Sequence, residues 1–407
     1  MPRRVRLVLC SPDGEPLGTL PEFGVETPWW PDVEPVVEIV RERFGIDIIV
    51  LRLLTADSSP PEMGGAVAYL AELVGDPPPG GILGSVIAGS AGEDHALRAD
   101  WARPGGVAAT VTWADAALAR IGRPRTERVV QVRSWNLSSI LRLPTASGDV
   151  WCKSVPPFFS HEGAILALVG AEDPSIVPTV LAADPKSRTV LLDDVAGEDQ
   201  YDASGSRLVE MVQRLVRLQS RLSGRVDDLR TAGLPDRRAR PLRDLIGTLA
   251  GRSDVRVQLT VEERVALDTL VADLPRRLAL LADCGLPETL VHGDFHPGNW
   301  RLGEDAFVLL DWGDSGIGHP MLDLTAFLPR VPDEVRERIL ATWLDAWNAE
   351  LPSADPLRAS ELVAPIAALR QALIYQGFLD GIEPDERRYH DTDVAYWLRR
   401  AIEGSSG

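Results

Sequence analysis

The residues best suited to chemistry lie in the segment HGDFHPGN at positions 292–299. Its glycines and proline predict a loop, within which Asp294 precedes Asn299 by five positions. The Asp294 carboxylate could accept the proton of an attacking hydroxyl, and the Asn299 amide oxygen could bind Mg²⁺ held by phosphate groups. The segment therefore predicts a site for phosphoryl transfer.

A second acidic residue, Asp311, follows the apolar strand predicted at 306–310. A short strand at 300–302 and the turn at 303–305 come before it, so the two strands should form a hairpin. The hairpin should return Asp311 towards Asn299. A carboxylate oxygen and an amide oxygen would then converge, and hard oxygen ligands of this kind suit Mg²⁺.

HGDFHPGN, followed by FVLLD at 307–311, closely resembles the aminoglycoside phosphotransferase and choline kinase superfamily. The resemblance extends over about residues 128–380. The alternative interpretation of the loop at 292–299 is a polar turn in an unrelated fold. The resemblance implies a protein-kinase-like fold and the ATP- and Mg²⁺-dependent phosphorylation of a hydroxyl on a small molecule. It also implies that Asp294 is the catalytic base and that Asn299 and Asp311 are the metal ligands.

The same resemblance points to residues that would bind the nucleotide. Lys153, one of two lysines in the chain, lies on the third predicted strand of the small lobe, where the superfamily contacts the α and β phosphates. Glu162, on the next predicted helix, would pair with it. Ser138 could contact phosphate from the first hairpin loop, and backbone groups of Asp193 and Val195 would face the adenine ring. The alternatives are a surface lysine, a solvated glutamate and an ordinary loop.

Other polar residues are expected to support the loop rather than to react. His292 should orient it through a hydrogen bond, and Asp323 should brace it as a matching aspartate does in the superfamily. His296 could line the substrate side or pack within the loop. Gln219 stands where the superfamily often has a histidine, which is a departure from the pattern.

Around these residues the hydrophobic pattern predicts an α+β protein. Short strands at 129–133, 138–143 and 149–155 precede a mainly helical region after Gly205. The fold class is therefore a bilobal protein-kinase-like fold, with a β-rich small lobe and a helical large lobe, preceded by a small α+β N-terminal domain. The predicted boundaries are 1–105 for the N-terminal domain, 106–127 for a linker helix, 128–197 for the small lobe and 198–407 for the large lobe.

The N-terminal region is predicted to run strand, helix, strand, strand. Its segment EIVRERFGIDIIVLRLL, at 38–54, faintly resembles the helix and strand of Nudix hydrolases. Those enzymes hold Mg²⁺ with several glutamates on one helix face, whereas here only Glu42 occupies such a position. Hydrolase activity is therefore not expected, and the role of residues 1–105 stays open.

Composition narrows the possible partners. The formal charge of −18 disfavours nucleic acid and anionic membranes, and no apolar run is long enough to span a membrane. Three scattered cysteines fit a reducing compartment, so a cytoplasmic location is expected. The acceptor could be cationic, held by the acidic stretch 380–385, which could equally be a solvated loop. A non-catalytic nucleotide-binding regulatory protein of the same fold is the alternative function.

Overall fold

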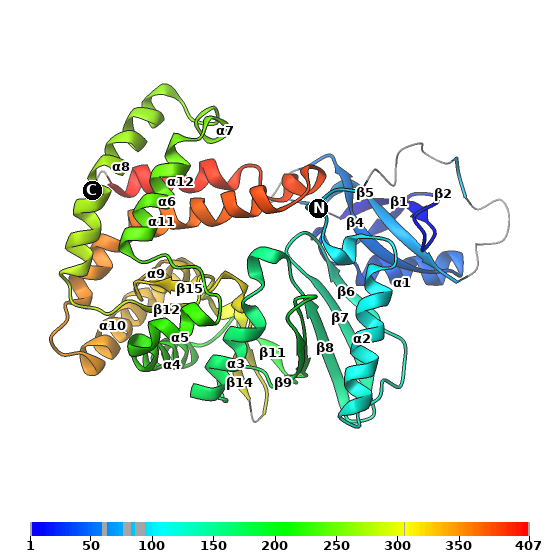
Figure 1. Cartoon of the computed structure of the whole chain (residues 1–407), viewed down its shortest axis with the longest axis horizontal. Coiled ribbons are helices and arrows are strands. Elements are labelled where there is room, and N and C mark those ends of the chain that lie inside the picture. Colours follow the sequence, from blue (N-terminus) through cyan, green and yellow to red (C-terminus); the bar gives the residue numbers. More distant parts are fainter. Residues whose placement is uncertain (1, 59–62, 76–82, 86–93, 305, 406–407) are drawn as a thin grey trace. The chain divides into compact units, whose positions relative to one another are not determined.

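The computed structural model describes residues 2–58, 63–75, 83–85, 94–304 and 306–405 (Figure 1). The chain divides into two compact units. Unit 1 consists of Met1–Ser160, Val180–Asp194 and Phe378–Asp391. Unit 2 consists of His161–Thr179, Val195–Gly377 and Thr392–Gly407.

The first sheet of unit 1 is built from the N-terminal residues. Its elements are β1 (Arg3–Cys10), β2 (Pro16–Thr19), β3 (Phe23–Val25), α1 (Glu34–Phe44), β4 (Asp47–Ala56) and β5 (Gly65–Val74). The strand order is β2-β1-β5-β4, with β3 also paired to β1, and β1 runs parallel to β5. Val36, Val37 and Val40 of α1 are buried in the core of this sheet. The expected order of strand, helix, strand, strand is present, with β2 and β3 added to it.

The second sheet of unit 1 is antiparallel and has the order β6-β7-β8-β10-β9. Its strands are β6 (Val130–Ser134), β7 (Ser139–Thr145), β8 (Gly148–Ser154), β9 (Val180–Asp184) and β10 (Thr189–Asp193). Unit 1 also contains three helical elements near these strands in sequence: η1 (Asp100–Ala102), α2 (Gly106–Arg120) and η2 (Pro157–Phe159). Helix α2 runs along this sheet (Figure 1) and buries Val107, Ala114 and Leu118 against it, because these residues share one helix face. The strands predicted at 129–133, 138–143 and 149–155 agree closely with β6, β7 and β8, whereas β9 was not predicted.

Hydrogen bonds join the two sheets of unit 1. The Gln131 side chain accepts from the Val50 amide and donates to the Val50 carbonyl, both at 2.8 Å. The Val33 amide donates to the Val132 carbonyl at 3.1 Å, and the Ser134 amide donates to Pro31 at 3.0 Å. Gln131 and Ser134 are both buried. The boundaries predicted at residues 105 and 127 stay predictions.

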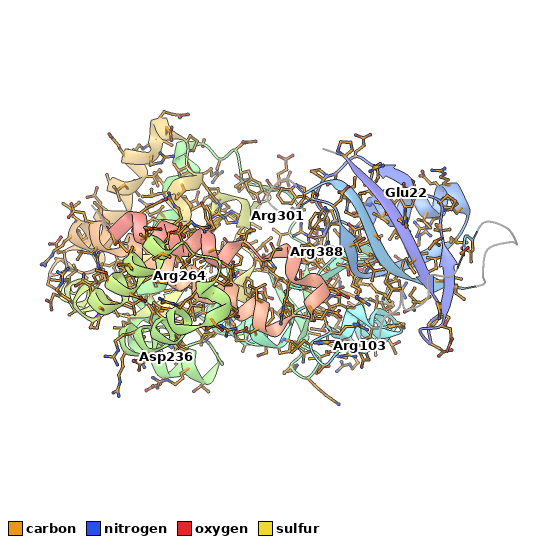
Figure 2. All side chains as sticks on the ribbon, turned by 90° about the horizontal axis from the view of Figure 1, so that it is seen from above. Glu22, Arg103, Asp236, Arg264, Arg301 and Arg388 are labelled. Carbon is orange, nitrogen blue, oxygen red and sulfur yellow. The ribbon has the colours of Figure 1, made fainter. Side chains whose placement is uncertain are left out.

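The segment Phe378–Asp391, which contains η7 (Pro384–Tyr389), belongs to unit 1 although it lies near the C-terminus. Glu383 Oε2 accepts from Arg98 Nη2 at 2.9 Å, and both side chains are buried. The Tyr389 ring packs edge-on against Trp30, with centroids 5.6 Å apart. Arg388, labelled in Figure 2, donates to the Ala56 carbonyl at 2.8 Å. The segment is thus part of the core built by residues 1–105.

Unit 2 is mainly helical, with two small sheets of order β11-β13-β14 and β12-β15. Its helices are α3 (Glu162–Glu172), α4 (Gly205–Leu222), α5 (Val226–Thr231), α6 (Ala239–Gly251), α7 (Ser253–Arg256), α8 (Val261–Ala282), α9 (Leu322–Phe327), α10 (Asp333–Glu350), α11 (Pro356–Gly381) and α12 (Asp393–Ser405). The strands are β11 (Glu198–Asp199), β12 (Thr289–Val291), β13 (Trp300–Leu302), β14 (Phe307–Leu309) and β15 (Gly316–Gly318). Short 3-10 turns lie between them: η3 (Ser223–Arg225), η4 (Pro297–Asn299), η5 (Trp312–Asp314) and η6 (Leu328–Arg330).

Helix α11 is the one helix in the described part of the chain that is long and apolar enough to cross a membrane by length and composition. Its 18-residue window has a mean hydropathy of 1.3, and 61% of that window is buried inside the protein. Val363, Ile366 and Leu369 are fully or almost fully buried. This burial is typical of a core helix. The strand-rich first part and helical remainder of the chain confirm the predicted α+β class.

Candidate active site

The segment 292–299 forms a loop and a turn, and the predicted hairpin follows it. Trp300 on β13 pairs with Leu309 on β14, and the Leu310 amide donates to the Asn299 carbonyl at 2.8 Å. The Asn299 amide nitrogen donates to the Asp294 carbonyl at 2.8 Å and to its carboxylate at 3.1 Å. The structure therefore brings Asp294, Asn299 and the residue before Asp311 together.

Asp311 occupies an unusual backbone conformation at the end of this hairpin. Its φ of 61° lies in the left-handed region, which costs a non-glycine residue of order 1 kcal/mol or more. The next amide, that of Trp312, donates to Glu162 Oε1 at 3.2 Å. Glu162 is buried in the first turn of α3, so this bond ties α3 to the residue after Asp311. Such strain is common at functional sites.

The Asp323 carboxylate holds the start of the loop. It accepts from the His292 amide at 2.9 Å and from the Gly293 amide at 2.8 Å. Gln219 on α4 donates to the same carboxylate at 2.8 Å, and burial raises the pKa of Asp323 to about 6 although the backbone donors oppose the shift. The prediction that Asp323 braces the loop agrees with these bonds. Gln219 adds a side-chain donor to the hydrogen bonds that Asp323 accepts.

Gly293 could not be replaced without strain. Its φ is +91°, and a Cβ built there would lie 2.3 Å from the Asp314 carbonyl oxygen and 2.9 Å from Arg370 Nη2. The residue before Asp294 must therefore be glycine for the loop to pass between η5 and α11. His292 lies on the other side, with Nε2 at 3.0 Å from the Leu310 carbonyl. Burial lowers the pKa of His292 to about 4, so its ring is neutral and orients the loop, as predicted.

His296 and Arg330 surround the Asp294 carboxylate. His296 Nδ1 accepts from the Gly298 amide at 3.0 Å, so the ring proton is on Nε2, which lies 3.3 Å from Asp294 Oδ2. Arg330 Nη2 is 3.8 Å from Asp294 Oδ1. Burial alone would raise the pKa of Asp294, but the His296 hydrogen bond and the nearby charge of Arg330 hold that pKa well below its usual range. The carboxylate is therefore ionised at neutral pH.

Tyr201 covers the turn after Asp294. Its ring stacks on His296 with centroids 5.9 Å apart and planes inclined by 29°. A Cβ built on Gly298 would lie 2.2 Å from the Tyr201 ring, so the glycine makes room for this stacking. Sequence reasoning missed Tyr201, because it lies in the loop after β11, almost a hundred positions from the motif, and no local pattern points to it.

A cavity of about 660 Å³ opens beside Gly293 and Asp294. Its other walls come from α9, η6, α11 and α12, and every lining residue belongs to unit 2. Apolar and aromatic side chains dominate the walls, and arginines are among them; representative residues are Leu322, Leu328, Arg330, Arg370, Tyr375 and Trp397. The sequence motif located Asp294 but none of these walls.

The predicted nucleotide-binding residues lie in both units. Lys153 is on β8, between Ile140 of β7 and Val190 of β10 in the sheet register. Ser138 is also in unit 1 and is buried, where its hydroxyl accepts from Trp135 Nε1 at 2.9 Å. Lys153 thus lies on the third strand of its sheet, as predicted, and its contact with phosphate stays a prediction.

The predicted hinge residues have polar contacts of their own. Asp193, also in unit 1, accepts on Oδ1 from Arg123 Nη1 at 2.8 Å. Val195, in unit 2, accepts on its carbonyl from Arg301 Nε at 2.6 Å; Arg301 is labelled in Figure 2. One acceptor at each position is thus already engaged within the protein. The proposed adenine contacts would use other backbone groups of this segment.

Within the described residues, no group of three or more His, Cys, Asp or Glu side chains could hold a metal ion by itself. A Mg²⁺ ion here would therefore need ligands from a nucleotide as well as from protein, as is usual for this ion. The Asn299 nitrogen is engaged by Asp294, which leaves its amide oxygen for a metal. Asp311 is exposed to solvent. The donor set fits Mg²⁺ with phosphate oxygens.

Asp294 bonded to Asn299, at the start of a hairpin on an α+β fold, is the arrangement expected of a phosphotransferase. The family model described as "Phosphotransferase enzyme family" matches residues 117–359, well over half of the chain. The chain belongs to this phosphotransferase family. The predicted membership of the aminoglycoside phosphotransferase and choline kinase group is thereby confirmed. A search of the curated proteins finds no match.

Solved structures share the fold at low sequence identity. A choline kinase from Streptococcus pneumoniae is similar with a TM-score of 0.53 and 13% identity, over 73% of this chain and 99% of that one. A candidate aminoglycoside phosphotransferase from Ralstonia eutropha gives 0.51 and 16%, over 73% and 98%. The GDP and kanamycin complex of APH(2″)-IIIa gives 0.50 and 13%, over 73% and 99%. These likenesses confirm the protein-kinase-like fold. The faint Nudix resemblance of residues 38–54 stays an interpretation of the sequence alone.

Proposed function

We propose that the protein is an ATP- and Mg²⁺-dependent kinase that phosphorylates a hydroxyl group of a small molecule. The observation that carries the proposal is the position of Asp294, an ionised carboxylate on the wall of a cavity of about 660 Å³, bonded to Asn299. A cavity of that size accommodates a small molecule rather than a polypeptide. The low-identity relatives include a choline kinase, which supports an acceptor of this size.

In this proposal Asp294 orients the acceptor hydroxyl and takes its proton during in-line transfer of the γ-phosphoryl group. His296 and Arg330 keep the carboxylate in place through contacts at 3.3 and 3.8 Å. Asp323 and Gln219 hold the backbone of the loop, so that the base is fixed before the substrate binds.

The Asn299 amide oxygen and the Asp311 carboxylate would hold Mg²⁺. The ion would offset the negative charge that develops on the phosphate oxygens. Asp311 is presented by its left-handed backbone, and Glu162 stabilises the following amide. These contacts support a fixed position for the second ligand.

The nucleotide residues stay part of the proposal. Lys153 would contact the α and β phosphates and would be held by Glu162, and Ser138 would approach the phosphates. Backbone groups of Asp193 and Val195 would bind adenine. A cytoplasmic location belongs to the proposal too, and the three cysteines, Cys10, Cys152 and Cys284, are buried and unpaired by disulfide bonds.

The test is nucleotide consumption with Mg²⁺ across a panel of amino-sugars, amino-alcohols, sugars and hydroxy acids, with ATP and GTP compared. Asp294→Asn should lower turnover by about 10²–10⁴-fold, the usual contribution of a general base, while Mg·ATP binding is retained. Asp333→Asn is the matched control, because Asp333 is exposed on α10 and pairs only with Arg336 in the described chain. Full activity of Asp294→Asn would overturn the mechanism. Nucleotide binding without consumption on any acceptor would favour the non-catalytic alternative.

A further inference from the structure

Arg370, on α11, is an unusual component of the cavity beside Asp294. Its side chain lines the cavity and the residue is only 4% exposed. Its Nη2 donates to the Asp314 carbonyl at 3.3 Å. Among the residues that the structure describes, no carboxylate forms a salt bridge with this guanidinium. Arginine is seldom buried without an ionic partner, because removing its charge from water is costly.

The nearest acidic side chains do not satisfy Arg370. Asp323 and Asp314 favour its charged form, but among the described residues neither carboxylate forms a salt bridge with it. The Asp323 carboxylate is occupied by Gln219 and by two backbone amides. Arg237 is also nearby and adds a second positive charge. An anion bound on the cavity side of Arg370 would give its guanidinium the ionic partner that it lacks within the described residues.

The other charged side chains that line the cavity also favour an anionic ligand. Three arginines line it, Arg330, Arg370 and Arg400, against two carboxylates, Asp294 and Glu403. Glu403 lies 3.5 Å from Arg400, and Asp294 is the proposed base. No carboxylate of the described walls is therefore left to bind an ammonium group.

The acidic stretch 380–385, which the sequence offered for a cationic acceptor, has other contacts. Glu383 is buried against Arg98, and Asp385 Oδ2 lies 3.3 Å from Arg52, both within unit 1. Neither residue lines the cavity. Glu383 is part of the core of unit 1, whereas the Asp385 carboxylate is largely exposed.

Distance also restricts where the anionic group would be. A Cβ on Gly293 would lie only 2.9 Å from Arg370 Nη2, and Gly293 immediately precedes the base. Arg370 and Asp294 line the same cavity, so a group bound by Arg370 and a hydroxyl that faces Asp294 can belong to one small molecule. The aromatic and aliphatic walls, such as Tyr375, Trp397 and Leu328, suit an apolar body beyond it.

We propose that the acceptor is a hydroxy acid with an apolar body, whose carboxylate binds Arg370 beside the hydroxyl that faces Asp294. This inference rests on the proposed function, since the cavity is an acceptor site only if Asp294 is the base. The guanidinium fork would bind the carboxylate through two parallel hydrogen bonds, which an amide or an amine cannot reproduce. In the transfer, the hydroxyl oxygen would bond to the γ-phosphorus as the bond to ADP breaks, and the hydroxyl proton would pass to Asp294.

The test uses three compounds of one skeleton: 3-phenyllactate, 3-phenyllactamide and 1-amino-3-phenyl-2-propanol. Their affinities are measured by calorimetry and saturation-transfer NMR, with Mg²⁺ and a non-hydrolysable ATP analogue present. The carboxylate should bind roughly tenfold or more tightly than the amine, with the amide between them. Equal affinities, the reverse order or no binding of the carboxylate would overturn the proposal.

Arg370→Gln should lower the affinity for 3-phenyllactate about tenfold and change that for the amide little. Arg400→Gln is the matched control, because Arg400 lines the same cavity but is exposed and paired with Glu403. A larger effect of the control than of Arg370→Gln would contradict the assignment. The wild-type series decides the question even if Arg370→Gln fails to fold. The affinity series measures binding and not phosphoryl transfer. A failure of phosphoryl transfer in the turnover assay would therefore overturn the proposed function without deciding the affinity test.

Discussion

The buried side chain of Gln219 links helix α4 to the loop that carries Asp294. It donates to Asp323 at 2.8 Å and to the Leu290 carbonyl at 3.1 Å, and it is 0% exposed. The superfamily pattern often has histidine here, and the glutamine amide supplies a donor of similar reach. A neutral donor is sufficient because the backbone amides of His292 and Gly293 also donate hydrogen bonds to the Asp323 carboxylate.

Replacement of Gln219 by leucine should therefore weaken both the fold and the site. The buried Asp323 carboxylate would lose a donor, which should cost about 1–3 kcal/mol in the free energy of unfolding. Denaturant unfolding and steady-state turnover are the measurements. Ser220→Ala, at the adjacent position, bonds on the surface to Glu350 and should change stability by less than about 0.5 kcal/mol. Equal losses in the two variants would contradict the role given to Gln219.

Glu386 provides a prediction about pH. Burial first, and then the charge of Glu383, raise its pKa to about 8, against about 4.3 in an unfolded chain. Between these values the folded protein retains a proton that the unfolded chain has released, so stability falls as the pH rises through this window. Glu386→Gln, which mimics the protonated acid, should raise the melting temperature at pH 8.5 and leave it nearly unchanged at pH 4.5.

The comparison is made by thermal unfolding from pH 4.5 to 8.5. Glu361→Gln, on the exposed side of α11, is the control and should follow the wild-type curve at every pH. A Glu386→Gln curve parallel to the wild-type curve would show that Glu386 titrates normally in the folded protein.

At the scale of elements, the segment Phe378–Asp391 is held in unit 1 by a buried ion pair. Arg98 and Glu383 have side chains only 7% and 4% exposed, and Arg52 lies 4.0 Å from the same carboxylate. Loss of one partner would leave a buried charge without compensation. The ion pair between Arg98 and Glu383 should therefore contribute more to holding this segment in unit 1 than its few hydrogen bonds suggest.

Arg98→Met should lower the free energy of unfolding by about 3–5 kcal/mol, and Arg98→Met with Glu383→Met should recover part of this loss. Denaturant unfolding of the two single variants and the double variant gives the coupling energy. Arg6→Met is the matched control, because the pair of Arg6 with Glu22 is exposed and should be worth less than about 1 kcal/mol. Additive losses in the cycle would show that the two side chains are not coupled.

Elements differed in how well the sequence predicted them. The hairpin between Trp300 and Leu309 was predictable, because its strands are adjacent in sequence and the turn residues lie between them. Strand β9 was missed: Val180–Asp184 is followed by a turn, and its alternation is weak. Arg370 and Tyr201 approach the loop at 292–299 only through tertiary packing, so no spacing along the chain could reveal them.

At the scale of the whole molecule, residues 1–105 and the sheet that follows them share hydrogen bonds and one compact unit. A chain that begins at Gly106 would lose the partners of Gln131, Ser134 and Tyr389, all of which are buried. Unsatisfied buried polar groups and an exposed apolar surface should prevent stable folding.

The expected result is that residues 106–407 alone are insoluble or lack a cooperative thermal transition. Co-expression with residues 1–105 should restore solubility, and size-exclusion chromatography with circular dichroism measures both outcomes. A monomeric, cooperatively folded fragment 106–407 would show instead that the N-terminal region folds as a domain of its own.

The contact of Tyr389 with Trp30 also has an evolutionary consequence. Two stretches of sequence more than 350 positions apart complete a single core, so neither is useful to the fold without the other. Relatives that lack the N-terminal region should carry a shorter or more polar connection between the last two helices. The two stretches should therefore have been gained, and would be lost, as one inherited character.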